Sequence, residues 1–117
     1  MANPLKFYRK NTCTIILDVC DYEFHNGDEL YFTVKLKPDS DQSDSDALIK
    51  HKWTYGTDVE PDANGSLYLI IPASETDIDY GDYFYDIKLV TSSQSPAAEN
   101  TLAVGTFTIM DVATLRV

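Results

Sequence analysis

The sequence predicts an all-β protein: an immunoglobulin-like antiparallel β-sandwich of about seven strands, formed by a single domain over residues 1–117. Short runs of alternating apolar and polar residues are the pattern of half-buried strands. Turn pairs such as Asn26-Gly27 and Asn64-Gly65 separate these runs. No run has the length of a helix that could connect parallel strands. A small closed barrel is the alternative architecture.

The first half of the chain reads as an extended segment over 5–9 followed by strands over 12–20, 28–37 and 47–55. The alternation in 28–37 is the clearest in the chain. The strand over 47–55 places His51 on the same side as Ile49 and Trp53, which favours a buried-edge or interface role for His51 over that of a ligand. The side chains expected to face the core are Cys13, Ile15, Leu17, Val19, Leu30, Phe32, Val34, Leu36, Ile49 and Trp53.

The second half begins with a loop over 56–65 and a strand over 66–71 that Pro72 ends. The run Ser74-Glu75-Thr76-Asp77 then offers N-cap chemistry for one short helical turn. Ile78 follows this turn, and we expect it to close one end of the sandwich.

Two more strands, over 82–91 and 101–110, complete the expected fold. The apolar positions of the last strand change parity, since Leu102 and Val104 are even whereas Phe107 and Ile109 are odd. Gly105 stands where the parity changes, and it therefore predicts a β-bulge there.

The run from Glu75 to Ile87 predicts a structural corner. In immunoglobulin-like sandwiches, a Tyr near the start of a late strand hydrogen-bonds back across the corner that precedes it. Asp79, Gly81 and Tyr83 stand at that spacing. Tyr85 occupies the place at which true immunoglobulin domains carry their second Cys. These four residues indicate an architecture and no chemistry.

The net charge of −10 restricts the partners that we expect. An acidic surface repels phosphate backbones and anionic membranes, so we expect neither nucleic acid nor membrane as a partner. No apolar run approaches the roughly 18 residues of a membrane span, and residues 1–6 show no secretory signal. We therefore expect a protein made in the cytoplasm. An acidic inhibitor or DNA mimic is a minor alternative.

The two cysteines, Cys13 and Cys20, are expected to be free thiols. Their odd spacing places them on opposite faces of one strand. Seven residues of strand extend about 23 Å, whereas a disulfide requires Cα atoms within about 7 Å. We interpret both as packing residues.

A search for catalytic or metal-binding patterns predicts no such site. The run 39–43 resembles the opening of a calcium loop, but the sixth position is Asp44 and the twelfth is Lys50, where glycine and glutamate are required. A solvated linker over 39–46 is the favoured interpretation. His25 and His51 lack partners at metal-binding spacing. We therefore predict no catalytic, cofactor-binding or metal-binding residues, and a protein that is not an enzyme.

The candidate interface residues are tyrosines and apolar residues near the C-terminus. Aromatic side chains are enriched in protein–protein contacts, although cross-strand packing explains many of them equally well. An exposed tyrosine cluster can also bind sugars. The residues predicted to contact a partner are Tyr31, Tyr68, Val112, Leu115 and Val117.

Four segments carry a family resemblance: 12–19, 27–35, 75–87 and 104–109. Together they resemble small structural proteins of phages and prophages of Gram-positive bacteria. They also resemble the N-terminal immunoglobulin-like domain of phage baseplate upper proteins. The resemblance covers most of the chain apart from the loops, and its Gly-x-Tyr-x-Tyr-Asp-Ile segment at 81–87 is the most distinctive part.

The resemblance implies a non-enzymatic tail or baseplate component that acts through protein–protein contacts. Its partners would be other virion or tail proteins, or further copies of itself. It would be made in the host bacterial cytoplasm and then enter the virion. A carbohydrate- or cell-surface-binding module is the alternative function.

Overall fold

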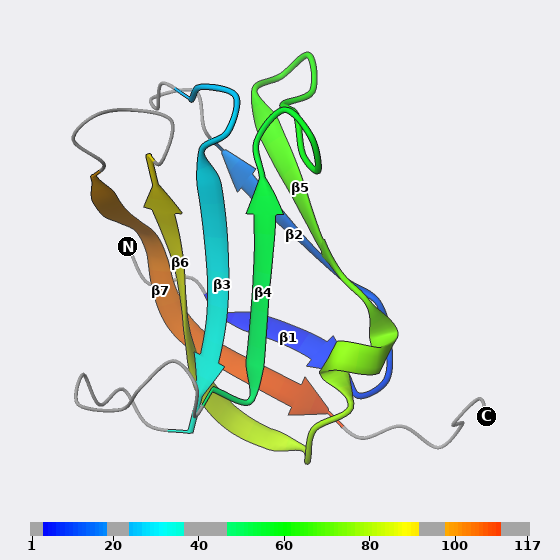
Figure 1. Cartoon of the computed structure of the whole chain (residues 1–117). Coiled ribbons are helices and arrows are strands. Elements are labelled where there is room, and N and C mark those ends of the chain that lie inside the picture. The colour runs from blue at the N-terminus through cyan, green and yellow to red at the C-terminus, as the bar shows by residue number, and fades with distance from the viewer. Residues whose placement is uncertain (1–3, 19–23, 37–46, 92–97, 111–117) are drawn as a thin grey trace.

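The computed structural model describes residues 4–18, 24–36, 47–91 and 98–110. Within these residues the strands form two sheets, one ordered β1-β7-β6-β3-β4 and the other β2-β5 (Figure 1). The strands are β1 (Leu5–Tyr8), β2 (Cys13–Asp18), β3 (Glu29–Lys35), β4 (Ile49–Thr54), β5 (Ser66–Ile71), β6 (Gly81–Val90) and β7 (Glu99–Met110).

The protein is an all-β immunoglobulin-like sandwich, as the sequence predicts. The two sheets are separate and pack against each other, so the described strands do not form a closed barrel. The larger sheet joins β3, β6 and β7 in the way that an immunoglobulin domain joins its C, F and G strands. The narrow second sheet pairs β2 with β5, as the B and E strands pair in that fold.

One strand pair departs from the antiparallel arrangement that the sequence suggests. β1 runs parallel to β7, with Leu5 opposite Phe107 and Tyr8 opposite Met110. A tight turn after β1, in which Lys10 has a φ of 61°, carries the chain from this sheet to β2. Residues 5–18 therefore belong to two sheets. One edge of the larger sheet is made by β1, which comes from the other end of the sequence than its neighbour β7.

The core follows the predicted alternation at nearly every described position. Phe32 of β3 lies at its centre, 5.8 Å from the ring centroids of both Tyr85 and Phe107. Leu36 is the exception: 60% of its side chain is exposed, because β3 ends at Lys35 and the alternation ends with it. The buried side chains of the strands include Cys13, Ile15, Leu30, Val34, Ile49, Trp53, Leu67, Leu69, Ile71, Tyr83, Ile87, Leu89 and Ile109.

The bulge in β7 lies nearer the start of the strand than predicted. Ile87 pairs with Ala103, whereas the next residue of β6, Lys88, pairs with Thr101. The extra residue is Leu102, and the register is regular through Gly105. As a result Val104 faces solvent, because the odd positions face the core from Ala103 onward.

The short helical turn is present, but its cap differs from the prediction. A 3-10 turn spans Ala73–Thr76, and its N-cap residue is Pro72, which makes no side-chain cap. The turn therefore begins before the run 74–77, and the prediction that this run supplies the N-cap is wrong. Thr76 is buried and its hydroxyl bonds to the carbonyl of Asn11 at 2.8 Å, which ties the turn to the start of β2. The following Ile78 packs partly buried against the core.

Candidate interaction surfaces

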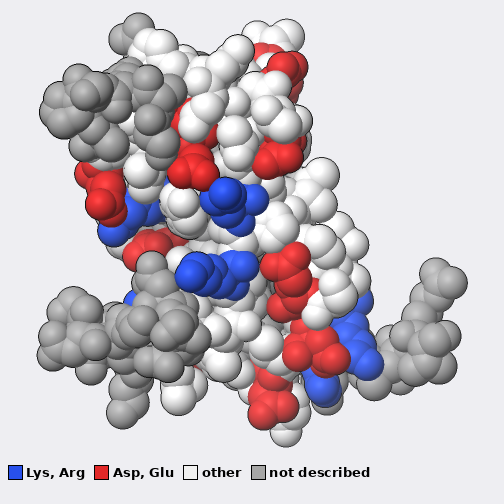
Figure 2. All heavy atoms as spheres, in the orientation of Figure 1, with Lys and Arg blue, Asp and Glu red and all other residues white. Residues whose placement is uncertain are grey.

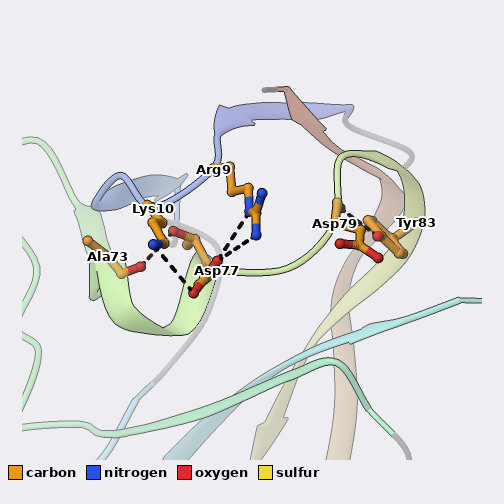
Figure 3. Close-up of polar contacts among 7 residues, drawn as sticks. Arg9, Lys10, Ala73, Asp77, Asp79 and Tyr83 are labelled. Carbon is orange, nitrogen blue, oxygen red and sulfur yellow. Dashed lines mark hydrogen bonds and ion pairs between the residues drawn. The ribbon is translucent and has the colours of Figure 1, made fainter. Parts of the chain in front are cut away.

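The corner that precedes β6 is closed by Tyr83. Its hydroxyl donates a hydrogen bond to the backbone carbonyl of Asp79 at 2.6 Å, and Figure 3 shows the Tyr83 ring reaching back to Asp79. Burial raises the pKa of the Tyr83 hydroxyl, so the group remains a donor at neutral pH. Gly81, between Asp79 and Tyr83, has a φ of 151°, a backbone conformation that residues with a side chain rarely adopt. Tyr85 is buried two residues further on.

Two basic residues hold the turn after β1 against the segment that precedes the corner. The Arg9 guanidinium lies 3.1 Å from an Asp77 carboxylate oxygen, and the Lys10 ammonium lies 3.9 Å from the other oxygen (Figure 3). The pairs are partly exposed, so their contribution to stability is small. Their effect is to fix the entry of β2 beside the helical turn.

Side chains of β4 join the two sheets along one side of the sandwich. The indole Nε1 of Trp53 donates to the carbonyl of Ile70 in β5 at 3.3 Å. His51 lies 2.9 Å from a Glu75 carboxylate oxygen, and its ring packs on Trp53 with centroids 4.7 Å apart. The sequence predicted an edge or interface role for His51; here it contacts a neighbouring turn of the same chain.

The outward face of the narrow sheet exposes three large apolar side chains. Ile16 is 64% exposed, Ile70 is 52% exposed and Tyr68 is 45% exposed. Ile16 stands directly opposite Tyr68 in the β2–β5 ladder, and Ile70 lies two residues beyond Tyr68 on the same face. We call Ile16, Tyr68 and Ile70 the β2–β5 patch. Apolar residues gathered in this way are typical of contact surfaces.

The tyrosine of this patch is held in place by the preceding turn. The Tyr68 hydroxyl donates to Asp62 at 3.0 Å, and Asp62 also accepts the backbone N–H groups of Asn64 and Ser66. These hydrogen bonds, the backbone ones first, lower the pKa of the Asp62 carboxyl below its ordinary 3.8. Tyr68 therefore presents its ring to solvent from a fixed position.

The outward face of the larger sheet carries a hollow of about 260 Å³. Tyr31 lies at this hollow and its hydroxyl donates to Glu29 at 3.2 Å. Desolvation, followed by the Glu29 charge, raises the Tyr31 pKa. The Lys88 ammonium lies 3.4 Å from a carboxylate oxygen of Glu99 across the same region. The hollow is lined by Tyr31, Thr33, Asp86, Lys88, Val90 and Glu99.

The described cysteine, Cys13, is a packing residue. Cys13 is fully buried, and this burial raises the pKa of its thiol from 9.0 to about 11, which keeps it protonated and unreactive. Cys20 and the acidic run 39–46 lie outside the described residues.

Within the described ranges, no three His, Cys, Asp or Glu side chains gather closely enough to hold a metal ion. The same ranges contain no helix that is long and apolar enough to cross a membrane.

The structure brings together only part of the predicted interface. Tyr68 belongs to the β2–β5 patch, whereas Tyr31 lies on the outward face of the other sheet. Val112, Leu115 and Val117 lie outside the described residues. Sequence reasoning did not identify Ile16 and Ile70 as patch residues. Their even positions in β2 and β5 were the available signal, because the odd positions of both strands are buried.

The sequence matches no protein-family model and no curated protein. Among solved structures, the chain is similar to the first immunoglobulin-like domain of human CD48 antigen. The two share 12% sequence identity with a TM-score of 0.38, over 99% of this chain and 88% of that one. The strand order and the Tyr83 corner define the architecture of this chain without reference to that domain.

Proposed function

We propose that this protein is a non-enzymatic structural component of a phage or prophage particle, associated with the tail or baseplate. Its role is assembly: surfaces of a rigid sandwich contact neighbouring virion proteins. Two observations support the proposal. Segments such as 75–87 resemble phage structural proteins, and the protein has a surface suited to protein contacts.

The observation that carries the proposal is the β2–β5 patch. Three large apolar side chains lie together on a sheet of only two strands, where a partner could cover them. Burying such side chains supplies the main driving force of protein association. The Tyr68–Asp62 hydrogen bond holds the aromatic ring in advance, which reduces the entropy lost on binding.

The corner that Tyr83 closes supports the same proposal. Tyr83 and Gly81 belong to the segment that carries the resemblance, and they shape the turn into β6. A domain braced in this way is suited to a repeated assembly, in which each copy must present the same surface.

The first test is the genetic neighbourhood and the composition of purified particles. Genes for tail, fibre or lysis proteins beside this one, and the chain itself in tail fractions by mass spectrometry, would support the proposal. Metabolic neighbours and particles that lack the chain would contradict it.

A variant test ties the role to the β2–β5 patch. A tagged chain with Ile16→Lys and Ile70→Lys should fold normally but enter purified particles much less than the parent chain. Thr57→Lys with Asn100→Lys is the matched control, because it adds the same charge at two exposed positions outside the patch. Equal incorporation of all three chains would show that the patch does not mediate assembly.

The hollow on the larger sheet favours a second candidate function, binding of a carbohydrate. Sugar sites combine an aromatic ring with polar groups that fix the hydroxyls, and here Tyr31 lies beside Asp86, Glu99 and Thr33. A glycan array, with and without Ca²⁺, tests this function. Binding that Tyr31→Ala abolishes would support it, whereas an array without signal would leave assembly as the favoured function.

A further inference from the structure

The charges on the outward face of the larger sheet are divided by strand. We call the solvent-facing side chains of four of its strands, β3, β4, β6 and β7, the outer face; the edge strand β1 adds one lysine, Lys6, beyond β7. The half made by β3 and β4 carries three lysines and one carboxylate: Lys35, Lys50, Lys52 and Glu29. The half made by β6 and β7 carries three carboxylates and one lysine: Asp82, Asp86, Glu99 and Lys88.

The four strands of the outer face are therefore neutral together, with a charge of +2 on one half and −2 on the other, and Lys6 adds +1 at the β1 edge of the sheet. The chain as a whole carries −10, so all of its net negative charge lies elsewhere. Figure 2 views the sheet in the orientation of Figure 1 and shows blue side chains over β4, with red and blue ones mixed over β6 and β7. Two copies of so acidic a chain repel each other over most of their surfaces, but not across this face.

A two-fold arrangement makes this division self-complementary. A two-fold axis parallel to the strands, placed between the neighbouring strands β3 and β6, sets β4 of one copy opposite β7 of the other. The same axis sets β3 opposite β6. Each basic half then faces an acidic half, and both contacts are made twice.

We propose that a second copy of this chain docks on the outer face, sheet against sheet, as a two-fold dimer. The attraction comes from the opposed halves, which act at a surface where neither copy carries net charge.

Apolar groups on the same face give the contact its buried area. Phe84 and Val104 are exposed on adjacent strands. Tyr31 and Val90 line the hollow between β3 and β6, at the position of the proposed axis. An aromatic centre surrounded by charged groups is the usual composition of a protein interface.

This inference goes beyond the proposed phage role and does not rest on it. The dimer uses the outer face, whereas contacts with other virion proteins are assigned to the β2–β5 patch on the opposite sheet. The gene neighbourhood tests the phage role alone, and self-association of the pure chain tests the dimer alone.

The experiment compares two charge-reversed variants by sedimentation equilibrium, alone and mixed. Lys50→Glu with Lys52→Glu makes both halves of the face acidic. Asp82→Lys with Asp86→Lys makes both halves basic. Each variant alone should raise the dimer dissociation constant by more than about tenfold, because like charges oppose one another. An equimolar mixture should restore the dimer as a heterodimer, because an acidic face then meets a basic one.

Arg9→Glu with Lys10→Glu is the matched control for the lysine variant, because it lowers the net charge by the same amount away from the outer face. Circular dichroism confirms that every variant is folded. The control should dimerise as the parent does, and raising the salt from about 50 to about 500 mM should weaken the parent dimer. A parent that stays monomeric at millimolar concentration, a control that dissociates as fully as the variants, or a mixture that does not restore the dimer would each overturn the proposal.

Discussion

Trp53 and Ile70 join the two layers of the sandwich, because the indole N–H of one donates to the backbone carbonyl of the other at 3.3 Å. The two residues belong to different sheets, and no backbone ladder connects β4 with β5 in the described strands. A buried side chain therefore makes a polar link between the layers, and the ring of His51 packs against it.

Replacing Trp53 by Phe tests this link. Phe retains an aromatic ring but cannot donate to Ile70, so we expect the free energy of unfolding to fall by about 2 kcal/mol. Urea unfolding followed by circular dichroism measures the change. Phe84→Leu, on the exposed face of β6, is the control and should cost much less. A Trp53→Phe variant within about 0.5 kcal/mol of the parent would mean that the link contributes nothing.

Removing the hydroxyl of Tyr83 tests the corner. Tyr83→Phe leaves the Asp79 carbonyl without its 2.6 Å donor, and we expect a loss of about 1 kcal/mol in unfolding free energy. Tyr80→Phe removes a hydroxyl from a well-exposed ring three residues earlier and should have almost no effect. Equal effects of the two substitutions would show that the corner hydrogen bond is not a source of stability.

The buried thiol of Cys13 predicts a loss of stability in alkaline solution. Its pKa is about 11 in the folded chain against an ordinary 9.0, so the folded state holds the proton more tightly than the unfolded state. The stability that the protonated Cys13 thiol gives the folded state is fully present below pH 9. It is lost as the pH rises toward 11, by up to about 3 kcal/mol. Unfolding free energies at about pH 8 and pH 10.5, compared between the parent and Cys13→Ala, isolate this contribution.

The burial of Cys13 can also be tested by the reaction of its thiol with a thiol reagent. In a Cys20→Ser background, the Cys13 thiol should react with a thiol reagent only as fast as the chain unfolds, because it is fully buried. Immediate reaction in the native protein would contradict the burial of Cys13.

The Asp62 turn predicts a loss of stability in acid. Its carboxylate accepts three hydrogen bonds, which lower its pKa below 3.8, so the folded state favours the charged form. The contribution is present above pH 3.8 and is lost as the pH falls through the lowered folded value. Asp62→Ala should lower the free energy of unfolding at neutral pH and should flatten the acid side of the stability profile. Glu60→Ala, exposed in the same loop, is the control.

The two faces of each strand were predictable because alternation is a local property. A strand such as β3 turns every second side chain inward, so the spacing of Leu30, Phe32 and Val34 predicts that all three are buried. The Tyr83 corner was equally predictable, since its donor and acceptor are four residues apart in sequence. The bulge was misplaced because β6 sets its position: the pairing of Lys88 with Thr101 makes Leu102 the extra residue.

The candidate surfaces depended on contacts that the sequence does not display. The β2–β5 patch exists because Ile16 and Tyr68, far apart in the chain, are paired in one ladder. The charge division of the outer face depends on the strand order, which sets β3 and β4 to one side and β6 and β7 to the other.

The amino-acid sequence by itself determined which residues form strands, which of their sides is apolar, and where a tyrosine closes a corner. These follow from the period of the backbone and from spacings of a few residues. Only the tertiary structure decided that β1 pairs in parallel with β7, that Trp53 links the layers, and that the lysines gather opposite the carboxylates. Those features depend on which distant strands become neighbours, and that choice is made by the packing of the whole core.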